Sequence, residues 1–369
     1  MSRPMVTGVI GAGAISGIYL KNMIRRFPDL EVKSIASAHM ENARKKAEEF
    51  GLRAVTVEEM LDDPDIGMVI VLTPVGSHEG LIRQALEHGK HVYTEKTLTD
   101  SPETARRLLE LADAKGLWLG SAPDTFLGAA MQTARKALDD GLLGEVHSFS
   151  VSATRCNDML LSLFSFLREP GCGILYDYAV YYVTSLVSLL GPVERVGAMV
   201  SAPYPTHTGI IPGRPEYGKA FASPNESQVS AALRMRSGVT GTFHLDAETV
   251  NADVAWFTIF GTKGMLKLTD PNQFGGDVMF FPTETDGWKP LQGRKLEPVS
   301  AYSDDCRGIG PQEMAEAIRE GRPGRASKEM ACHVLDVLSA MLAGGKDGAF
   351  REIASTCERP APYFGPGTD

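Results

Sequence analysis

Residues 5–17 read MVTGVIGAGAISG, an apolar run that passes directly into a glycine-rich turn. Residues 18–26 then have the apolar spacing of a helix, so the stretch predicts a strand, a tight turn and a helix. In such a unit Gly11 permits the turn, and Gly13 lets a pyrophosphate approach the backbone. The N–H groups of Ala14 and Ile15 lie where the positive end of the helix attracts phosphate. These four residues are therefore predicted to bind a dinucleotide.

The same alternation of β-branched runs and amphipathic segments continues to about residue 120. It is typical of βαβ units around a doubly wound parallel sheet, so residues 1–123 are predicted to form an α/β Rossmann domain. The expected strands are 6–10, 32–37, 68–72, 91–94 and 118–120, and the expected helices are 18–26, 41–50, 78–87 and 102–115.

From residue 124 onward strands follow one another, which predicts a second, α+β domain over residues 124–358 that binds substrate and oligomerises. Residues 202–225 are rich in proline and glycine and are expected to form a long surface loop bordering a site. Residues 359–369 are expected to be a loosely held tail. The expected strands are 146–153, 193–201, 228–235, 239–246, 255–261 and 264–268. From 193–201 onward each is expected to pair antiparallel with the next. The expected helices are 129–140, 174–190, 312–320 and 328–342.

Composition narrows the class of protein. The 369 residues are 43% hydrophobic and 22% charged, which excludes disordered and fibrous classes. The formal charge of −9 disfavours nucleic acid and anionic membrane as partners. The five cysteines form no C-x-x-C pair and the histidines no H-x-x-x-H pair, so we expect no metal and reduced thiols in a cytoplasmic protein. The first residues have no apolar h-region before the first strand, so we expect no leader, and residues 174–190 are shorter than the roughly 20 apolar residues of a membrane span.

Ser37 stands at the end of the second predicted strand, where an enzyme specific for NAD places an acidic residue for the adenosine ribose. A neutral hydroxyl there does not repel a 2′-phosphate, and His39 or Arg44 can approach one. The cofactor is therefore NADP or NAD, with NADP favoured, and Ser37 and His39 are predicted cofactor contacts. The alternative for Arg44, Lys45 and Lys46 is an ordinary solvated helix face.

Two further segments end predicted strands at the carboxyl edge of the sheet, where open α/β sheets bind ligands. The first is LTPVGSH, residues 72–78, and it makes Thr73, Pro74 and His78 candidate cofactor contacts. The second is GKHVYTEKT, residues 89–97, and it places Glu95 and Lys96 at the same edge.

These segments, with the glycine loop and the GCGILYD stretch at residues 171–177, resemble the Gfo/Idh/MocA family over nearly the whole chain. The resemblance implies a Rossmann domain joined to a domain with a large, open, mainly antiparallel sheet. It also implies an NAD(P)-dependent oxidoreductase that acts on the CH–OH group of a sugar, inositol or related polyol. Two residues depart from the family pattern: Thr97 replaces a usual proline after Lys96, and Tyr181 replaces the histidine that serves as acid or base.

Hydride transfer from an alcohol carbon requires a group that takes the hydroxyl proton. We expect Lys96 to polarise the reacting oxygen, and Tyr181 or Lys96 to relay the proton, with Asp177 orienting one of them. Asp177 and Tyr181 are spaced i, i+4 on the predicted helix and so share a face. An adjacent ammonium favours phenolate, which makes a tyrosine usable as a base.

Asp124 and Arg155 are further candidate substrate contacts, and Asn157 and His244 are weaker ones. Structural alternatives are a turn for Asp124, a strand hydrogen bond for His244, and packing for Tyr181 of the predicted helix. Two other functions remain open, an NAD-dependent glycosidase and a noncatalytic nucleotide-binding regulator. The open sheet is expected to be covered by a second subunit, which gives a homodimer or homotetramer.

Overall fold

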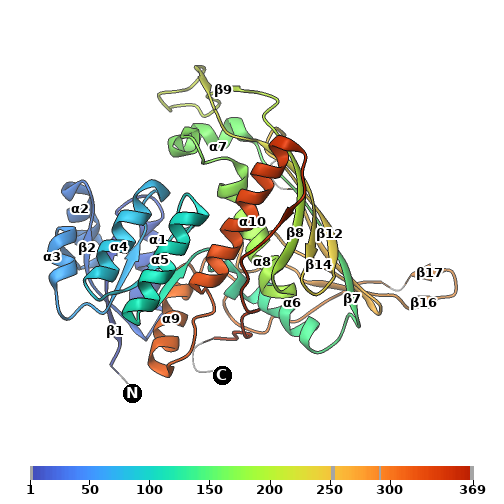
Figure 1. The fold of residues 1–369 in the computed structure, drawn as a ribbon, viewed down its shortest axis with the longest axis horizontal. Helices are drawn as coiled ribbons and strands as arrows, with labels where there is room; N and C mark the ends of the chain where they lie inside the picture. The colour runs from blue at the N-terminus through green and yellow to red at the C-terminus, as the bar shows by residue number, and fades with distance from the viewer. Residues whose placement is uncertain (1–2, 251–253, 291, 366–369) are drawn as a thin grey trace. The chain divides into compact units, whose positions relative to one another are not determined.

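The computed structural model describes residues 3–250, 254–290 and 292–365 (Figure 1). The chain divides into two compact units. Unit 1 contains the described residues up to Gly128, Tyr302–Cys332 and those from Tyr363 onward, and unit 2 contains Ala129–Ala301 and His333–Pro362. The helix predicted at 312–320 therefore packs with the N-terminal half, although the sequence placed it in the range 124–358. An amphipathic pattern predicts a helix but does not say which core the helix joins.

Unit 1 is built on a six-stranded parallel sheet with the order β3-β2-β1-β4-β5-β6. The order reverses between β1 and β4, as in doubly wound nucleotide-binding sheets, and confirms the predicted Rossmann fold. All four residues of β4 are buried, because helices cover both faces. The strands are β1 (Met5–Ile10), β2 (Leu30–Ala36), β3 (Arg53–Ala54), β4 (Met68–Val71), β5 (His91–Thr94) and β6 (Leu119–Ser121).

The helices of this sheet begin and end at recognisable signals. At the start of α5, Ser101 accepts a hydrogen bond from the Thr104 amide at 3.3 Å, and Pro102 occupies the first helical turn. The sequence prediction missed α3, although Thr56 and Glu59 form a reciprocal capping box there. The helices are α1 (Ser16–Arg25), α2 (Met40–Phe50), α3 (Val57–Asp62), α4 (His78–Glu87), α5 (Pro102–Lys115) and, from the returning segment, α9 (Ile309–Glu320).

Unit 2 is built on a nine-stranded sheet with the order β18-β15-β14-β13-β7-β12-β11-β8-β19. The predicted strands exist, but β12 and β13 are not neighbours. Strand β7 lies between them, parallel to β12 and antiparallel to β13, so the expectation of consecutive antiparallel pairing is wrong at this point. The strands are β7 (Val146–Thr154), β8 (Val193–Ser201), β11 (Gln228–Met235), β12 (Thr240–Asp246), β13 (Ala255–Gly261), β14 (Gly264–Leu268), β15 (Met279–Pro282), β18 (Arg294–Lys295) and β19 (Arg351–Glu352).

Side chains alternate along these strands between a buried face and a more accessible one. On β12, Phe243 and Leu245 are buried, while Thr242 and His244 lie on the other face. Helices lie along the buried face, including α6 (Ala129–Asp139) and α8 (Val180–Leu190) (Figure 1). The apolar helix predicted at 174–190 begins as a π-helix over Leu175–Ala179 and continues as α8. The remaining helices are α7 (Asn157–Leu163) and α10 (Lys328–Asp347).

Two segments expected to be loose are structured. Within residues 202–225, β9 (Thr206–Thr208) pairs with β10 (Ala220–Ala222), and buried His207 bonds to Asp158 of α7 at 3.0 Å. A second small hairpin joins β16 (Thr285–Asp286) to β17 (Lys289–Pro290). In the predicted tail the carbonyl of Pro360 accepts a hydrogen bond from Arg135. Residues 359–365 are therefore held by contacts that the proline content concealed, and residues 366–369 lie outside the described part of the chain.

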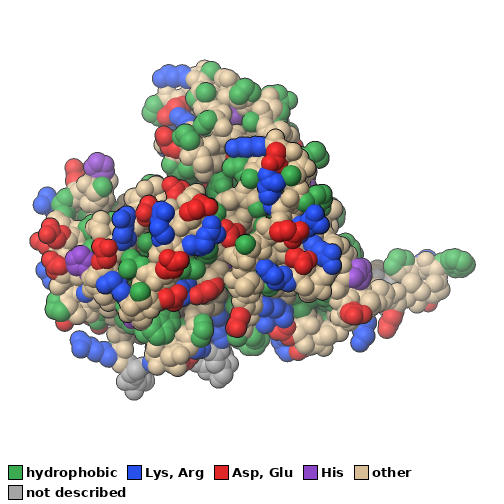
Figure 2. Space-filling view, in the orientation of Figure 1, with side chains coloured by type: hydrophobic (Ala, Val, Ile, Leu, Met, Phe, Trp, Pro, Cys, Tyr) green, Lys and Arg blue, Asp and Glu red, His purple; other side chains and the backbone are tan. Residues whose placement is uncertain are grey.

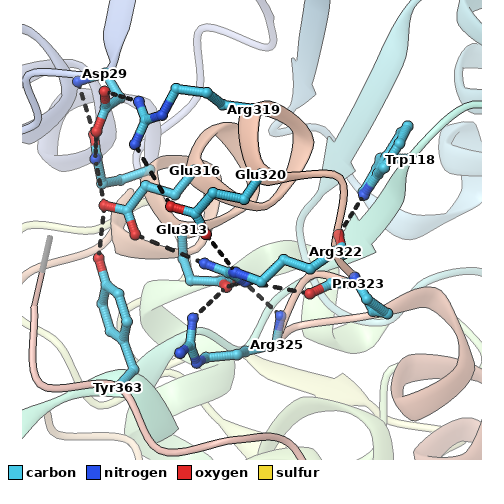
Figure 3. Close-up of polar contacts among 11 residues, drawn as sticks. Asp29, Trp118, Glu313, Glu316, Arg319, Glu320, Arg322, Pro323, Arg325 and Tyr363 are labelled. Carbon is cyan, nitrogen blue, oxygen red and sulfur yellow. Dashed lines mark hydrogen bonds and ion pairs between the residues drawn. The ribbon is translucent and has the colours of Figure 1, made fainter. Parts of the chain in front are cut away.

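A buried ion cluster lies within the returning segment of unit 1 (Figure 3). Glu313 is 1% exposed and accepts hydrogen bonds from Arg322 at 2.5 Å and from Arg325 at 2.9 Å. The indole N–H of Trp118 donates to the Arg322 carbonyl at 3.0 Å. Removal of one charged member would leave its partners buried and unpaired. Because an unpaired buried charge costs several kcal/mol, we expect such a change to destabilise the fold.

The same helix carries a second contact set one turn further on. Glu316 accepts from Gln312 at 2.9 Å and from the Tyr363 phenol at 3.3 Å, and Arg319 pairs with Asp29 (Figure 3). Burial raises the pKa of Glu316. Together the two sets attach α9 and the chain end around Tyr363 to the Rossmann sheet.

Candidate functional site

The glycine loop of unit 1 has the backbone that the dinucleotide prediction requires. Gly11 has φ +121°, and a Cβ there would lie 2.4 Å from the Leu72 carbonyl oxygen, so only glycine fits. Gly13 is exposed and has open space where a Cβ would be. The buried Ser16 hydroxyl donates to the Gly13 carbonyl at 2.7 Å and holds the turn against α1.

Gly13 and Ala14 are exposed at this turn, and Ile15 is the N-cap of α1, with no side-chain cap hydrogen bond. The helix therefore presents backbone N–H groups without a side-chain acceptor of its own at the cap. This arrangement fits an anionic pyrophosphate, because N–H groups and the helix dipole both favour negative charge there.

The end of β2 carries the two residues predicted to contact the adenosine ribose. Ser37 is half-buried directly after the strand, and His39 is exposed as the N-cap of α2. Lys45 pairs with Glu41 at 2.7 Å, an ion pair along the helix surface. This pairing agrees with an ordinary solvated helix face for Lys45.

The loop after β4 places Thr73, Pro74 and His78 differently from one another. Thr73 is half-buried and Pro74 exposed, whereas His78 has no exposed surface. Its Nδ1 lies 2.8 Å from the Thr97 carbonyl oxygen and its Nε2 lies 2.8 Å from that of Thr73. Burial lowers the pKa of the imidazole. His78 thus links the loop after β4 to the loop after β5 through both ring nitrogens, and neither nitrogen is free for the predicted cofactor contact.

Glu95 and Lys96 follow β5 and are both half-buried. The Glu95 carboxylate accepts a hydrogen bond from the Tyr19 phenol at 2.7 Å and another from the Lys96 backbone N–H at 3.1 Å. The Lys96–Thr97 peptide bond is cis, at the position where the family pattern has proline. Tyr19 was not singled out by sequence reasoning, because a tyrosine on an amphipathic helix signals only packing.

Asp124, a predicted substrate contact, is only 1% exposed. Its Oδ2 accepts from the Gly308 and Gly310 N–H groups at 3.0 and 3.1 Å, which caps the start of α9. Burial raises the pKa of this carboxyl to about 6, against the opposing effect of those N–H groups. Asp124 therefore accepts backbone hydrogen bonds, as the turn interpretation expects, but the donors lie in the returning segment and not in a local turn.

In unit 2, Asp177 lies in the π-helix and Tyr181 in the first turn of α8, and both are half-buried. The wider π turn changes the simple i, i+4 face geometry expected for one continuous α-helix. Glu226 anchors the start of this segment, since its Oε1 accepts from the Leu175 N–H at 3.2 Å. A π turn at a candidate acidic residue is a frequent mark of a functional position.

Arg155 belongs to a polar cluster next to this helix. Its guanidinium pairs with Asp270 at 2.9 Å and lies 3.8 Å from the centre of the Tyr178 ring. The Tyr178 phenol donates to Asp270 at 2.8 Å and lies 3.1 Å from the Tyr182 hydroxyl. Burial raises the pKa values of both phenols. Sequence reasoning missed Tyr178 and Asp270, because nothing local marks an Asp-Pro turn after β14 as part of a site.

The two weaker candidates lie elsewhere in unit 2. His244 is on the accessible face of the sheet, opposite Ser230, whose hydroxyl lies 2.8 Å from its Nδ1. This is the strand hydrogen bond of the structural alternative. Asn157 donates to Glu248 at 3.3 Å.

Within residues 3–250, 254–290 and 292–365 there is no group of three His, Cys, Asp or Glu side chains that could hold a metal. No helix in those ranges is long and apolar enough to cross a bilayer.

A glycine loop after the first strand of a β3-β2-β1-β4-β5-β6 parallel sheet defines a dinucleotide-binding protein. Residues 5–122 match the oxidoreductase family with an NAD-binding Rossmann fold, and residues 131–267 match the GFO/IDH/MocA C-terminal domain. The protein belongs to the Gfo/Idh/MocA family of oxidoreductases.

The chain is similar to several known proteins. It is 31% identical to dTDP-3,4-didehydro-2,6-dideoxy-alpha-D-glucose 3-reductase of Streptomyces violaceoruber over 266 residues, 70% of this chain and 72% of the relative. It is 25% identical to scyllo-inositol 2-dehydrogenase (NADP(+)) of Bacillus subtilis (strain 168), over 92% of this chain and 93% of the relative. The structure of levoglucosan dehydrogenase in complex with NADH matches with a TM-score of 0.82 at 20% identity, covering 96% of this chain and all of the other.

Proposed function

We propose that the protein transfers hydride between a nicotinamide dinucleotide and a hydroxyl or ketone carbon of a sugar, inositol or related polyol. One observation supports this proposal most strongly: the Gly11–Gly13 turn and the Glu95–Lys96 segment both follow strands at the same edge of one parallel sheet. The names of the similar proteins, a deoxysugar 3-reductase and an inositol dehydrogenase, support the substrate class.

The residues of the turn fit the cofactor, since they offer backbone N–H groups and a glycine without a neighbouring obstruction. Gly11, Gly13, Ala14 and Ile15 would hold the pyrophosphate, Ser37 and His39 the adenosine ribose, and Thr73, Pro74, Glu95 and Lys96 the nicotinamide side. When bound, the nicotinamide accepts the hydride in oxidation and supplies it in reduction.

We assign the proton chemistry to three side chains. In oxidation the alcohol carbon loses a hydride and its oxygen loses a proton, so one group must accept that proton. Lys96 polarises the oxygen, Tyr181 or Lys96 accepts the proton, and Asp177 orients the acceptor. To Arg155, which pairs with Asp270 and lies over the Tyr178 ring, we assign hydrogen bonds to other substrate hydroxyls.

NADP is the cofactor we propose, because Ser37 leaves the ribose position without a carboxylate. His39 is exposed beside it and can approach a 2′-phosphate.

All five cysteines are free thiols, which suits the reducing cytoplasm as the proposed location.

We also propose a homodimer or homotetramer built on the accessible face of the nine-stranded sheet. One cross-strand row on this face runs through Met199, Ser230, His244, Ser152 and Trp256. Met199 is 72% exposed and Trp256 is 53% exposed at its two ends. An accessible sheet face with large exposed apolar side chains at both ends of a cross-strand row suits another flat surface.

The deciding experiment measures the absorbance of reduced nicotinamide with NAD and NADP against a panel of sugars, inositols and their keto forms. Lys96→Met should lower kcat by roughly 100-fold or more and leave dinucleotide affinity nearly unchanged. The control is Lys115→Met, an exposed lysine at the end of α5. Full turnover by Lys96→Met would refute the assignment of Lys96. Glycoside cleavage without net cofactor reduction would favour a glycosidase, and nucleotide binding without turnover would favour a regulator.

A further inference from the structure

Tyr19 of helix α1 makes a side-chain hydrogen bond to the segment that carries Lys96. It is fully buried, and its hydroxyl donates to Glu95 Oε1 at 2.7 Å. The other carboxylate oxygen, Oε2, accepts from the backbone N–H of Lys96 at 3.1 Å. One carboxylate is therefore held from two sides, by a phenol on α1 and by the amide of the lysine itself.

The direction of the first hydrogen bond follows from the surroundings. Burial, the nearby Asp124 carboxylate and Glu95 all raise the pKa of the Tyr19 phenol. The phenol consequently keeps its proton at neutral pH and donates, while the carboxylate accepts. A hydrogen bond to a charged group in a buried setting contributes more than a neutral one.

We infer that Tyr19 is a positioning residue for Lys96, acting through the Glu95 carboxylate. This inference rests on the proposed catalytic role of Lys96. Removal of the phenolic hydroxyl leaves one Glu95 oxygen without its donor, so the carboxylate can rotate and its hold on the Lys96 amide weakens. Because α1 starts at Ser16, which binds the Gly13 carbonyl, the same helix joins the pyrophosphate turn to the lysine.

Tyr93 shows that burial of a tyrosine ring here does not by itself demand such a bond. It is also fully buried in unit 1, but its hydroxyl has no hydrogen-bond partner among the described residues. Tyr19→Phe and Tyr93→Phe therefore make the same chemical change at equal burial, and only the first removes a contact with Glu95. Any effect of losing a buried hydroxyl in general is common to both.

The test compares full-length wild type with Tyr19→Phe, Tyr93→Phe, Glu95→Gln and the double variant Tyr19→Phe/Glu95→Gln. We expect Tyr19→Phe to lower kcat by about tenfold, with dinucleotide affinity changed by less than about threefold. Tyr93→Phe should keep wild-type kcat. The double variant should have the kcat of Glu95→Gln alone, since Tyr19 acts through that residue. Equal losses from both Phe variants, or losses that multiply in the double variant, would overturn the inference.

A second measurement does not depend on turnover. An amine-reactive reagent followed by mass spectrometry gives the labelling rate of Lys96 relative to exposed Lys115. Tyr19→Phe and Glu95→Gln should both change the Lys96 rate several-fold and leave the Lys115 rate unaltered, and Tyr93→Phe should change neither. Unaltered Lys96 labelling in Tyr19→Phe contradicts the positioning role. If wild type shows no turnover on any substrate, the proposed function fails, while the labelling comparison still decides this inference.

Discussion

Replacement of Asp124 by asparagine should make the stability of unit 1 less sensitive to pH. Oδ2 of Asp124 accepts hydrogen bonds from the Gly308 and Gly310 N–H groups at 3.0 and 3.1 Å, and Asp124 itself is 1% exposed. The hydrogen bonds and Arg307 favour the charged form, but desolvation is the larger effect, and it raises the pKa from 3.8 to about 6. Asparagine keeps an acceptor oxygen and carries no charge, so the variant removes the cost of burying a carboxylate.

The sign follows from proton binding. Between 3.8 and about 6 the folded state binds more protons than the unfolded chain, so the free energy of unfolding falls as the pH rises through this window. The difference between 3.8 and about 6, at about 1.4 kcal/mol per pKa unit, corresponds to about 3 kcal/mol over the full transition. Wild type should therefore lose roughly 2 kcal/mol relative to Asp124→Asn between about pH 4 and about pH 7.5.

Guanidinium unfolding followed by Trp118 fluorescence measures this difference. Trp118 donates to the Arg322 carbonyl and so reports on the attachment of the returning segment. A background of Trp256→Phe and Trp288→Phe leaves it as the sole tryptophan. Thr125→Val, a neighbouring buried change without a titratable group, should cost the same at both pH values. If the stability gap between wild type and Asp124→Asn is the same at both pH values, the burial argument is refuted.

Two further predictions concern the cofactor and the accessible sheet face. Ser37→Asp should raise KM for NADP roughly tenfold relative to that for NAD, because a carboxylate there repels the 2′-phosphate; an unchanged ratio of the two KM values would remove Ser37 from the cofactor site. Ser150→Arg should convert the proposed oligomer to a monomer in sedimentation velocity, since Ser150 lies on β7 between Thr242 and Thr258 on that face, and an oligomer of wild-type size would exclude this face as the interface.

Much of the architecture followed from local sequence. The turn at Gly11 requires a positive φ and close approach to Leu72, which only glycine tolerates, so the pattern predicted both the turn and the sheet that it opens. Ser101 and Pro102 predicted the start of α5 for an equally local reason. The sequence did not predict strand β3, because a strand of two residues has no periodicity to detect.

The pairing of strands was decided by tertiary structure. Strand β7 enters the sheet between β12 and β13, far from its place in the chain. Alternation of buried and accessible residues predicts that a strand has two faces, but it does not identify the neighbouring strand. The same limit explains the membership of α9 in unit 1, where Gln312 donates to Asp29 and Trp118 donates to the Arg322 carbonyl.

The candidate site divides along the same line. Sequence alone singled out the glycine turn and Glu95 with Lys96, because a strand followed by a phosphate-binding turn or by a polar pair is a local pattern. Only the folded chain revealed that Tyr19 bonds to Glu95, that Asp124 caps α9, and that Asp270 holds Arg155. These contacts join residues distant in sequence, and a buried polar group takes whichever partner the fold brings within hydrogen-bond distance.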